Sequence, residues 1–268
     1  MRELRTCPVT GVNVLLNDAW PDRPAPAPPS PATCWACAPT TTEIVRSGGV
    51  FAVPHPVPAL GVEGDVRPRV TPSGVQRDAV GAHELLVGAH AGPDAPLLHL
   101  AAARVADLRR DTRLRGFALL REAVPGAHVA WQLFALPYDV ATTDARGWRA
   151  AELAANVRVV ASRGTAVAIA AWAPTTPFET WVLAREGAGE LPEAVDDVAA
   201  LAEDVLRAQQ RLLGGARVNL TVAFGEPWRL VLRPHVDATA PTAAVGLPAH
   251  GVTPERAVRL LRAEPALR

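Results

Sequence analysis

The order of apolar segments along this chain repeats, and this repetition limits the folds available to it more than any other feature. Each half of the sequence contains an apolar segment, a proline-containing loop, a second apolar segment, a long amphipathic stretch and two further apolar segments. Equal order and similar spacing indicate an internal duplication with its junction near residues 145–155. The alternative is a chance similarity between common elements. We therefore expect two halves of one architecture, residues 1–148 and 149–268.

The long amphipathic stretches predict helices, and the short apolar segments predict strands. Leu98, Ala101 and Val105 recur at helical spacing in the first half, as Val198 and Val205 do in the second. Strands are predicted from period-two or short continuous apolar runs. These runs lie at 50–53, 84–87, 117–120, 131–136, 157–161, 165–172, 180–183, 218–224 and 228–232. Antiparallel strands with one long helix packed per half indicate an α+β fold rather than a parallel doubly wound sheet.

The charge balance and the kinds of charged residue exclude several functions. The formal net charge is zero, so nothing favours a polyanionic partner and we expect no nucleic-acid partner. All 27 basic residues are arginine, which excludes Schiff-base and lysine-base mechanisms. The sequence shows no signal-peptide pattern, no apolar run of membrane-spanning length and no secreted disulfide framework among its three cysteines. We therefore expect a cytoplasmic protein without a membrane partner.

Short motifs spread along nearly the whole chain match one known family in the same order. The motifs are PVTG at 8–11, RP at 23–24, CWAC at 34–37, PAL at 58–60, HELLV at 83–87, QLFALP at 132–137, PFETW at 177–181 and TPERA at 253–257. Each motif alone is weak, but in this order they resemble the galactose-1-phosphate uridylyltransferase family of the histidine-triad superfamily. The resemblance implies two fused histidine-triad-like halves, each with an antiparallel sheet and a long helix. It also implies a homodimer and a closing helix at the C-terminal motif.

A zinc site is the first functional feature that the resemblance implies. A Cys-x-x-Cys pair, here Cys34 and Cys37, serves metal and redox chemistry equally. The family pattern supplies His90 and His128 as two more ligands, and two thiolates with two imidazoles form a tetrahedral zinc set. A closed four-ligand site is structural, and this one would fasten the proline-rich loop at 21–32 to the first half. The alternatives are a thioredoxin-like redox pair, or an unused reduced pair beside two ordinary histidines.

The residue that performs the family's chemistry is missing. The family reacts through a covalent uridylyl-histidine, formed on the second histidine of a His-Pro-His-Gly-Gln motif. This sequence reads HVAWQ at 128–132, which puts Ala130 at the nucleophile position. A methyl group cannot form a phosphoramidate, so we expect the double-displacement reaction to be lost. Trp131 replaces a small glycine and is expected to fill or reshape the phosphate pocket, whereas Gln132 is retained.

Three hypotheses about function remain open. The first is a repurposed enzyme, for instance in specialised metabolism, whose old nucleotide cleft binds a different small molecule. Its pocket candidates are His55, His83, Trp131, Gln132 and Glu179. The second is a nucleotidyltransferase or nucleotide hydrolase that works by direct attack, because phosphoryl chemistry depends largely on positioning. The third is a non-catalytic ligand-binding or partner protein. Each candidate also has a purely structural interpretation, Trp131 as a core residue and the two histidines as strand-edge and loop residues.

The histidines of the family's second metal site are absent from 228–233, so we expect no second metal.

Overall fold

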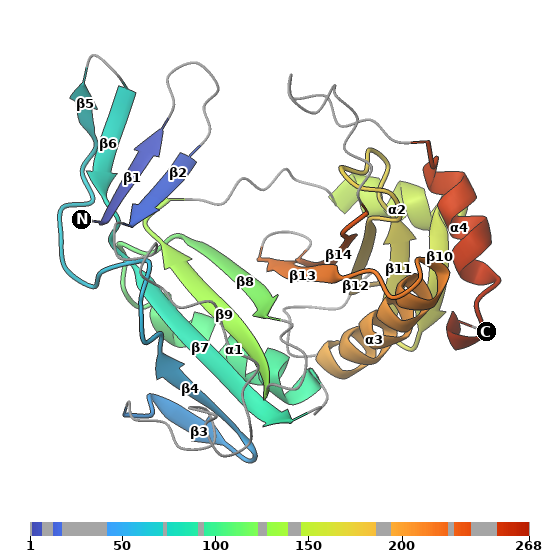
Figure 1. Cartoon of the computed structure of the whole chain (residues 1–268), viewed down its shortest axis with the longest axis horizontal. Coiled ribbons are helices and arrows are strands. Elements are labelled where there is room, and N and C mark those ends of the chain that lie inside the picture. The colour runs from blue at the N-terminus through green and yellow to red at the C-terminus, as the bar shows by residue number, and fades with distance from the viewer. Residues whose placement is uncertain are drawn as a thin grey trace. The chain divides into compact units, whose positions relative to one another are not determined.

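The chain forms two compact units, Met1–Val140 and Ala141–Arg268, in a computed structural model (Figure 1). The structure describes residues 2–6, 13–17, 42–71, 74–90, 94–122, 128–138, 146–185, 194–224, 228–236 and 251–267. The division predicted after residue 148 falls inside a helix, α2 (Arg146–Ala155), which belongs to the second unit.

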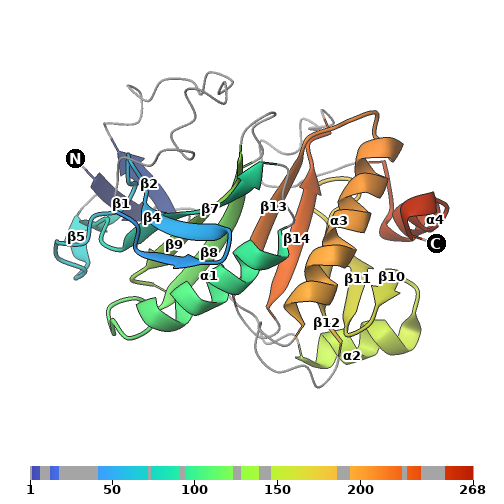
Figure 2. The same cartoon turned by 90° about the horizontal axis from the view of Figure 1, so that it is seen from below.

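A five-stranded antiparallel sheet forms the centre of the first unit. Its strands are β3 (Val45–Ser47), β4 (Val50–Pro54), β7 (Ala82–His90), β8 (Gly116–Glu122) and β9 (His128–Leu136). Their order in the sheet is β3-β4-β7-β9-β8. The helix α1 (Ala95–Leu108) lies along one face of this sheet and contacts β4, β7 and β9 (Figure 2).

The two faces of this sheet differ because successive strand residues point to opposite sides. On β7, Glu84 points to α1, where Arg104 donates hydrogen bonds to both of its carboxylate oxygens at 2.9 and 2.7 Å. Its neighbour Leu85 lies on the other face, in a buried cluster with Phe51 and Val53. The sheet is therefore covered by α1 on one face. Neighbouring residues of one sequence motif lie on opposite faces of the sheet, so the face of each residue has to be determined separately.

A second, four-stranded antiparallel sheet belongs to the same unit. Its strands are β1 (Arg2–Thr6), β2 (Asn13–Asn17), β5 (Arg69–Thr71) and β6 (Gly74–Asp78), in the order β2-β1-β6-β5. The apolar pattern of the sequence did not predict this sheet, because segments such as RELRT and GVQRD are mostly polar.

The second unit has its own five-stranded antiparallel sheet with helices on both faces. The strands are β10 (Val159–Arg163), β11 (Ala166–Ala170), β12 (Thr180–Ala184), β13 (Val218–Ala223) and β14 (Arg229–Pro234). The long helix α3 (Val195–Leu212) contacts β10 to β14, and α4 (Pro254–Arg262) contacts β10 and β11 (Figure 2). On the face opposite α3, Trp148 and Leu153 of α2 pack on a buried cluster of strand residues. A short 3-10 helix, η3 (Pro265–Leu267), follows α4.

The two five-stranded sheets have the same topology. Their orders, β3-β4-β7-β9-β8 and β10-β11-β12-β14-β13, correspond strand for strand, and a long helix follows the third strand in each unit. The prediction of an α+β fold with antiparallel sheets is thus confirmed, as are the two long helices and the apolar strands.

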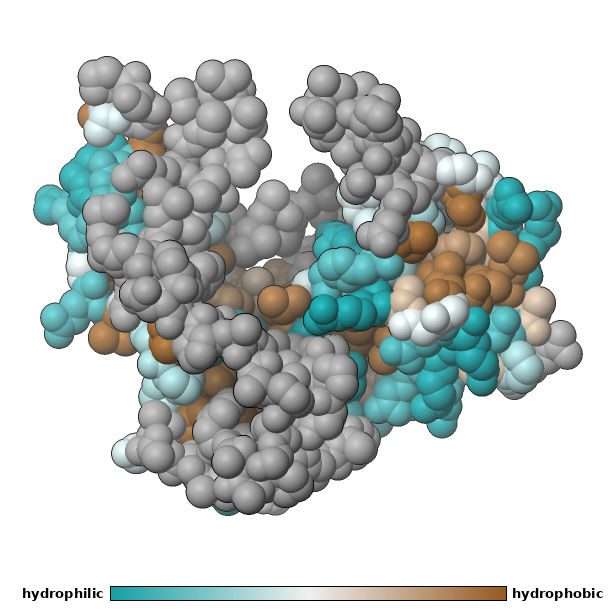
Figure 3. All heavy atoms as spheres, viewed as in Figure 1, coloured by the Kyte–Doolittle hydropathy of each residue, from teal (hydrophilic) through white to brown (hydrophobic). Residues whose placement is uncertain are grey.

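Hydrophobic and hydrophilic residues both reach the surface on the side of the second unit drawn in Figure 3. The large hydrophobic side chains described as exposed in this unit are Val157, Trp172 and Leu260. Within the described residues, none of the helices combines the length and the apolar character needed to cross a membrane.

Candidate functional site

The position that resembles the family's nucleophile lies on the face of the first sheet opposite α1. Ala130 on β9 is buried, and its register partner on β7 is Val87, a member of the cluster on that face. Because strand residues alternate, Gln132 shares this face with Ala130. Its register partner, Leu85, belongs to the same cluster. Ala130 and Gln132 are therefore next to each other on one surface of the sheet.

His83 and Gln132 form a buried hydrogen-bonded pair on this face. The backbone N–H of Ala59 donates to His83 Nδ1 at 3.0 Å, so this ring nitrogen acts as an acceptor. The other nitrogen, Nε2, lies 2.9 Å from Gln132 Oε1 and must carry the proton that it donates there. His83 is 5% exposed, and both of its nitrogens have partners, which leaves neither available as a nucleophile.

His55 stacks on His83 and extends the pair into a column of three rings. The two imidazole centroids are 4.0 Å apart, and the Phe134 ring stacks on the other side of His83 at 4.2 Å. His55 also accepts a hydrogen bond at Nδ1 from the backbone N–H of Val57. The segment that follows β4 therefore folds onto the sheet and is held there by two imidazoles.

Trp131 lies on the other face, so the structure does not place it with Gln132 and His83. Its indole N–H donates to Oδ1 of Asp94, the residue directly before α1, at 2.8 Å. The Trp131 side chain is fully buried. Arg121, the register partner of Trp131 on β8, donates to the same oxygen at 3.1 Å. The prediction that Trp131 lines one pocket together with Gln132 and His83 is thus wrong, because adjacent strand residues point to opposite faces of the sheet.

Glu179 belongs to the second unit and is fixed by a tight turn. Phe178, just before it, has a φ of 64°, a left-handed conformation that is uncommon for a bulky residue. The Glu179 carboxylate accepts from the backbone N–H and hydroxyl of Thr175 at 2.9 and 2.7 Å, and from the indole of Trp181 at 2.9 Å. Burial acts to raise the pKa of Glu179, but these hydrogen bonds and the charge of Arg233 outweigh it and lower the pKa.

Only part of the predicted zinc site lies among the described residues. Cys34 and Cys37 lie outside the described residues, and of His90 and His128 only the backbone is described. These two histidines are register partners at one end of the β7–β9 pair. Register partners in antiparallel strands lie on the same face with their Cα atoms about 4.5–5.5 Å apart. The backbone therefore fits two imidazole ligands of one metal ion. Within the described part of the chain, His, Cys, Asp and Glu side chains form no cluster of three that could hold a metal.

Sequence reasoning missed the residues that fix the predicted ones in place. Asp94, which precedes a helix and is followed by Ala95-Pro96, resembles an N-cap, yet its side chain makes no cap bond and binds Trp131 instead. The Ala59 N–H and the Phe134 ring act on His83 through contacts between distant segments. Alternation along β9 is the one signal in the sequence that separates Trp131 from Gln132.

Solved structures match this chain over nearly its whole length and define its fold as that of the uridylyltransferases. A uridylyltransferase structure has a TM-score of 0.71 at 17% identity and covers 99% of this chain and 98% of its own. The ADP-glucose phosphorylase of Arabidopsis thaliana, solved with bound ADP-glucose, has a TM-score of 0.68 at 18% identity, with 98% and 99% covered. A DUF4931 family protein from Bacillus cereus has a TM-score of 0.55 at 11% identity, with 83% and 98% covered.

These identities correspond to a distant likeness in fold. The resemblance to the galactose-1-phosphate uridylyltransferase family, inferred from the order of short motifs, is confirmed at the level of the fold. No protein-family model matches the sequence, and no curated protein sequence matches it significantly.

Proposed function

We propose that this chain is a protein of uridylyltransferase fold that has lost uridylyl transfer by double displacement and acts as an enzyme on a different small molecule. The observation that carries the proposal is the position of Ala130. Ala130 lies on the same sheet face as Gln132 and His83. The family's covalent reaction would need a histidine at this position. A buried methyl group offers no lone pair to phosphorus.

The histidines described near Ala130 do not replace the missing group. Both nitrogens of His83 are engaged, one by the Ala59 N–H and one by Gln132. His55 is stacked on His83 and uses Nδ1 to hold the backbone of Val57. A nucleophile must present a free lone pair to the reacting atom, and these hydrogen bonds fix the rings in other roles. Their arrangement supports the loss of covalent chemistry at this position.

The chemistry of this face supports a ligand with less phosphate than a nucleotide sugar. The described groups around His83 are a second imidazole, His55, the amide of Gln132 and the apolar ring of Phe134. Neither His83 nor any of these three side chains carries the permanent positive charge that guanidinium or ammonium groups bring to phosphate. Arg46, on the edge strand of the same face, is paired with Glu43 and lies over the Phe51 ring. Stacking surfaces and single hydrogen-bonding groups suit a largely neutral ligand.

We also propose that Cys34, Cys37, His90 and His128 hold one zinc ion in the first unit. When bound, zinc in such a closed set acts as a structural cross-link and offers no open coordination position to a substrate. The register of His90 and His128 supports this assignment.

From the resemblance to the galactose-1-phosphate uridylyltransferase family we also propose a homodimer. Light scattering on the intact protein tests this oligomeric state.

An internal duplication is the origin that we propose for the two units. The matching strand orders of the two sheets support it, as does the long helix after the third strand of each. Each unit has five antiparallel strands and one interposed helix in the same order. A pattern of this length rarely arises twice in one chain by chance. The chemistry described above belongs to the first unit.

An isotope-exchange assay tests the proposed loss of double displacement. A double-displacement enzyme moves labelled glucose 1-phosphate into UDP-glucose without an acceptor, because it forms the covalent intermediate reversibly. We expect no exchange with UDP-glucose, or with ADP-glucose, the ligand of the Arabidopsis structure. An active uridylyltransferase run in parallel is the control. Exchange by this chain would refute the proposal, and nucleotide hydrolysis without exchange would favour direct attack by water.

A further inference from the structure

Two arginines lie on the same face of the second unit's sheet. Arg229 and Arg233 are four residues apart on β14, so their side chains point to the same side. Trp181 on β12 shares this side, because its register partner is Val231, midway between the two arginines. The opposite side carries α3, since Gln209 of α3 donates to the hydroxyl of Thr180. The two guanidinium groups therefore lie on the face away from the long helix.

Arg229 is a half-buried cation without a carboxylate partner among the described residues. Its guanidinium stacks over the Trp181 ring at 4.8 Å from the centroid. Its Nε is buried and has no hydrogen-bond partner in the structure. Burial lowers the pKa of Arg229 and the charge of Arg233 lowers it further, whereas Glu179 acts in the opposite direction. A partly buried guanidinium without a carboxylate partner is stabilised when an anion binds to it.

The one carboxylate described beside this pair is already engaged. Glu179 lies 3.4 Å from Arg233 Nε, and its oxygens also accept three hydrogen bonds from Thr175 and Trp181. Two guanidinium charges set against one carboxylate leave one positive charge in excess. A bound group with about one negative charge would balance this excess.

From this geometry we infer that Arg229 and Arg233 form a binding site for an oxyanion, the phosphate or carboxylate group of a small molecule. Guanidinium groups bind such groups through paired N–H donors, and stacking on Trp181 holds the Arg229 plane in one orientation. Asn219 and Thr221 on β13 are the register partners of Arg233 and Val231, and they add an amide and a hydroxyl on the same face. The site lies within the second unit and does not depend on the function proposed for the first.

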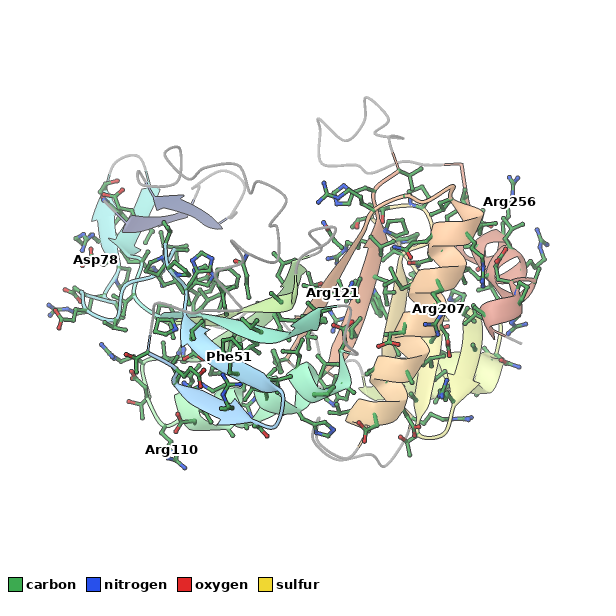
Figure 4. The ribbon with its side chains drawn as sticks, turned by 60° about the horizontal axis from the view of Figure 1, so that its bottom comes forward. Phe51, Asp78, Arg110, Arg121, Arg207 and Arg256 are labelled. Atoms are coloured by element: carbon green, nitrogen blue, oxygen red, sulfur yellow. The ribbon has the colours of Figure 1, made fainter. Side chains whose placement is uncertain are left out.

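Titration of the intact protein with inorganic phosphate, and separately with acetate, tests the site. Phosphorus NMR line broadening for phosphate and carbon NMR for labelled acetate distinguish the two kinds of anion at low salt. We expect saturable binding of at least one, weakened about tenfold or more in Arg229→Gln, because each charge-assisted hydrogen bond contributes strongly. Arg256→Gln is the matched control and should bind as the wild type does, since Arg256 points away from α4 into solvent (Figure 4).

Glu179→Gln supplies a second test that loss of folding cannot imitate. Removing the carboxylate frees Arg233 from its ion pair and raises the local positive charge, so anion binding should become tighter than in the wild type. A thermal melt first checks that each variant is folded. Equal affinity of wild type and Arg229→Gln would overturn the inference. Absence of saturable binding in the wild type, or weaker binding in folded Glu179→Gln, would overturn it as well.

Discussion

The side on which each residue of β9 points decides what that residue can do. Ala130 and Gln132 face the histidine pair, whereas Trp131 between them is buried beneath α1 and donates to Asp94. A change at one position therefore affects a different part of the protein from a change at the next. Ala130 and Trp131, the two positions at which the sequence motif is expected to depart from the family pattern, therefore lie on opposite faces of the sheet.

Trp131→Phe should destabilise the fold and leave the opposite face unchanged. The substitution removes the N–H that Asp94 accepts, and Asp94 is a buried carboxylate. A buried polar group that loses a partner costs about 1–3 kcal/mol of unfolding free energy. Urea denaturation of wild type and variant measures this loss. Trp172→Phe, at a side chain that is 65% exposed, is the control, and its effect should stay within about 0.5 kcal/mol. Equal stability of Trp131→Phe and wild type would show that the hydrogen bond is not needed.

At the scale of elements, the start of β7 depends on a glycine. A Cβ added to Gly81 would lie 2.1 Å from the backbone carbonyl oxygen of Ala135 on β9, and Gly81 has a φ of 155°. Backbone cannot move aside as a flexible side chain can, so Gly81→Ala should cost about 2 kcal/mol or more in unfolding free energy. Gly49→Ala, where no atom lies within 4 Å, is the matched control in the same unit. Equal melting temperatures for the two variants would contradict this packing of β7 against β9.

The turn before β12 should make stability depend on pH through Glu179. Its folded-state pKa is lowered below the ordinary value of 4.5, so its contribution is fully present above that pH. The contribution is lost as the pH falls through the lower folded pKa, where the carboxylate gains a proton. The stability difference between wild type and Glu179→Gln should therefore be larger at neutral pH than at about pH 3. A difference independent of pH, measured by urea denaturation, would rule out this role.

The sequence predicts elements where apolar residues are periodic and misses them where tertiary contacts decide. The sequence predicts the strands VFAVP and AVAIA because they are short apolar runs, and nearly every residue in them is buried. It does not predict the four-stranded sheet, because segments such as RELRT and GVQRD are mostly polar. The helix α2, RGWRAAELAA, lies where the internal repeat predicts only a junction between the two halves. Of the site, the motif order predicted Gln132 and His83, but stacking of His55 on His83 joins segments that no spacing rule connects.

At the scale of the whole molecule, the two units share a topology but differ in the chemistry that each carries. The first unit contains the proposed zinc ligands and the histidine pair, and the second contains the arginine pair beside Glu179. Each unit has a sheet covered by its own long helix. This division allows the proposals for the two units to be tested and refuted separately.

Zinc content is the prediction that belongs to this scale. Elemental analysis of the purified protein should find about one zinc per chain, as a closed four-ligand site requires. Cys34→Ser and Cys37→Ser should each lose the metal and lower the melting temperature, because a structural metal stabilises the fold that binds it. Cys7→Ser lies outside the proposed set and is the control. Zinc retained in both Cys34→Ser and Cys37→Ser would refute the assigned ligands.

The mass of the intact protein after incubation with UDP-glucose tests the central claim most directly. If Ala130 stands where the nucleophile would act, no uridylyl group can become attached, and the mass should stay that of the untreated chain. An acid-labile increase equal to one uridylyl group, located on any histidine of this chain, would contradict the account.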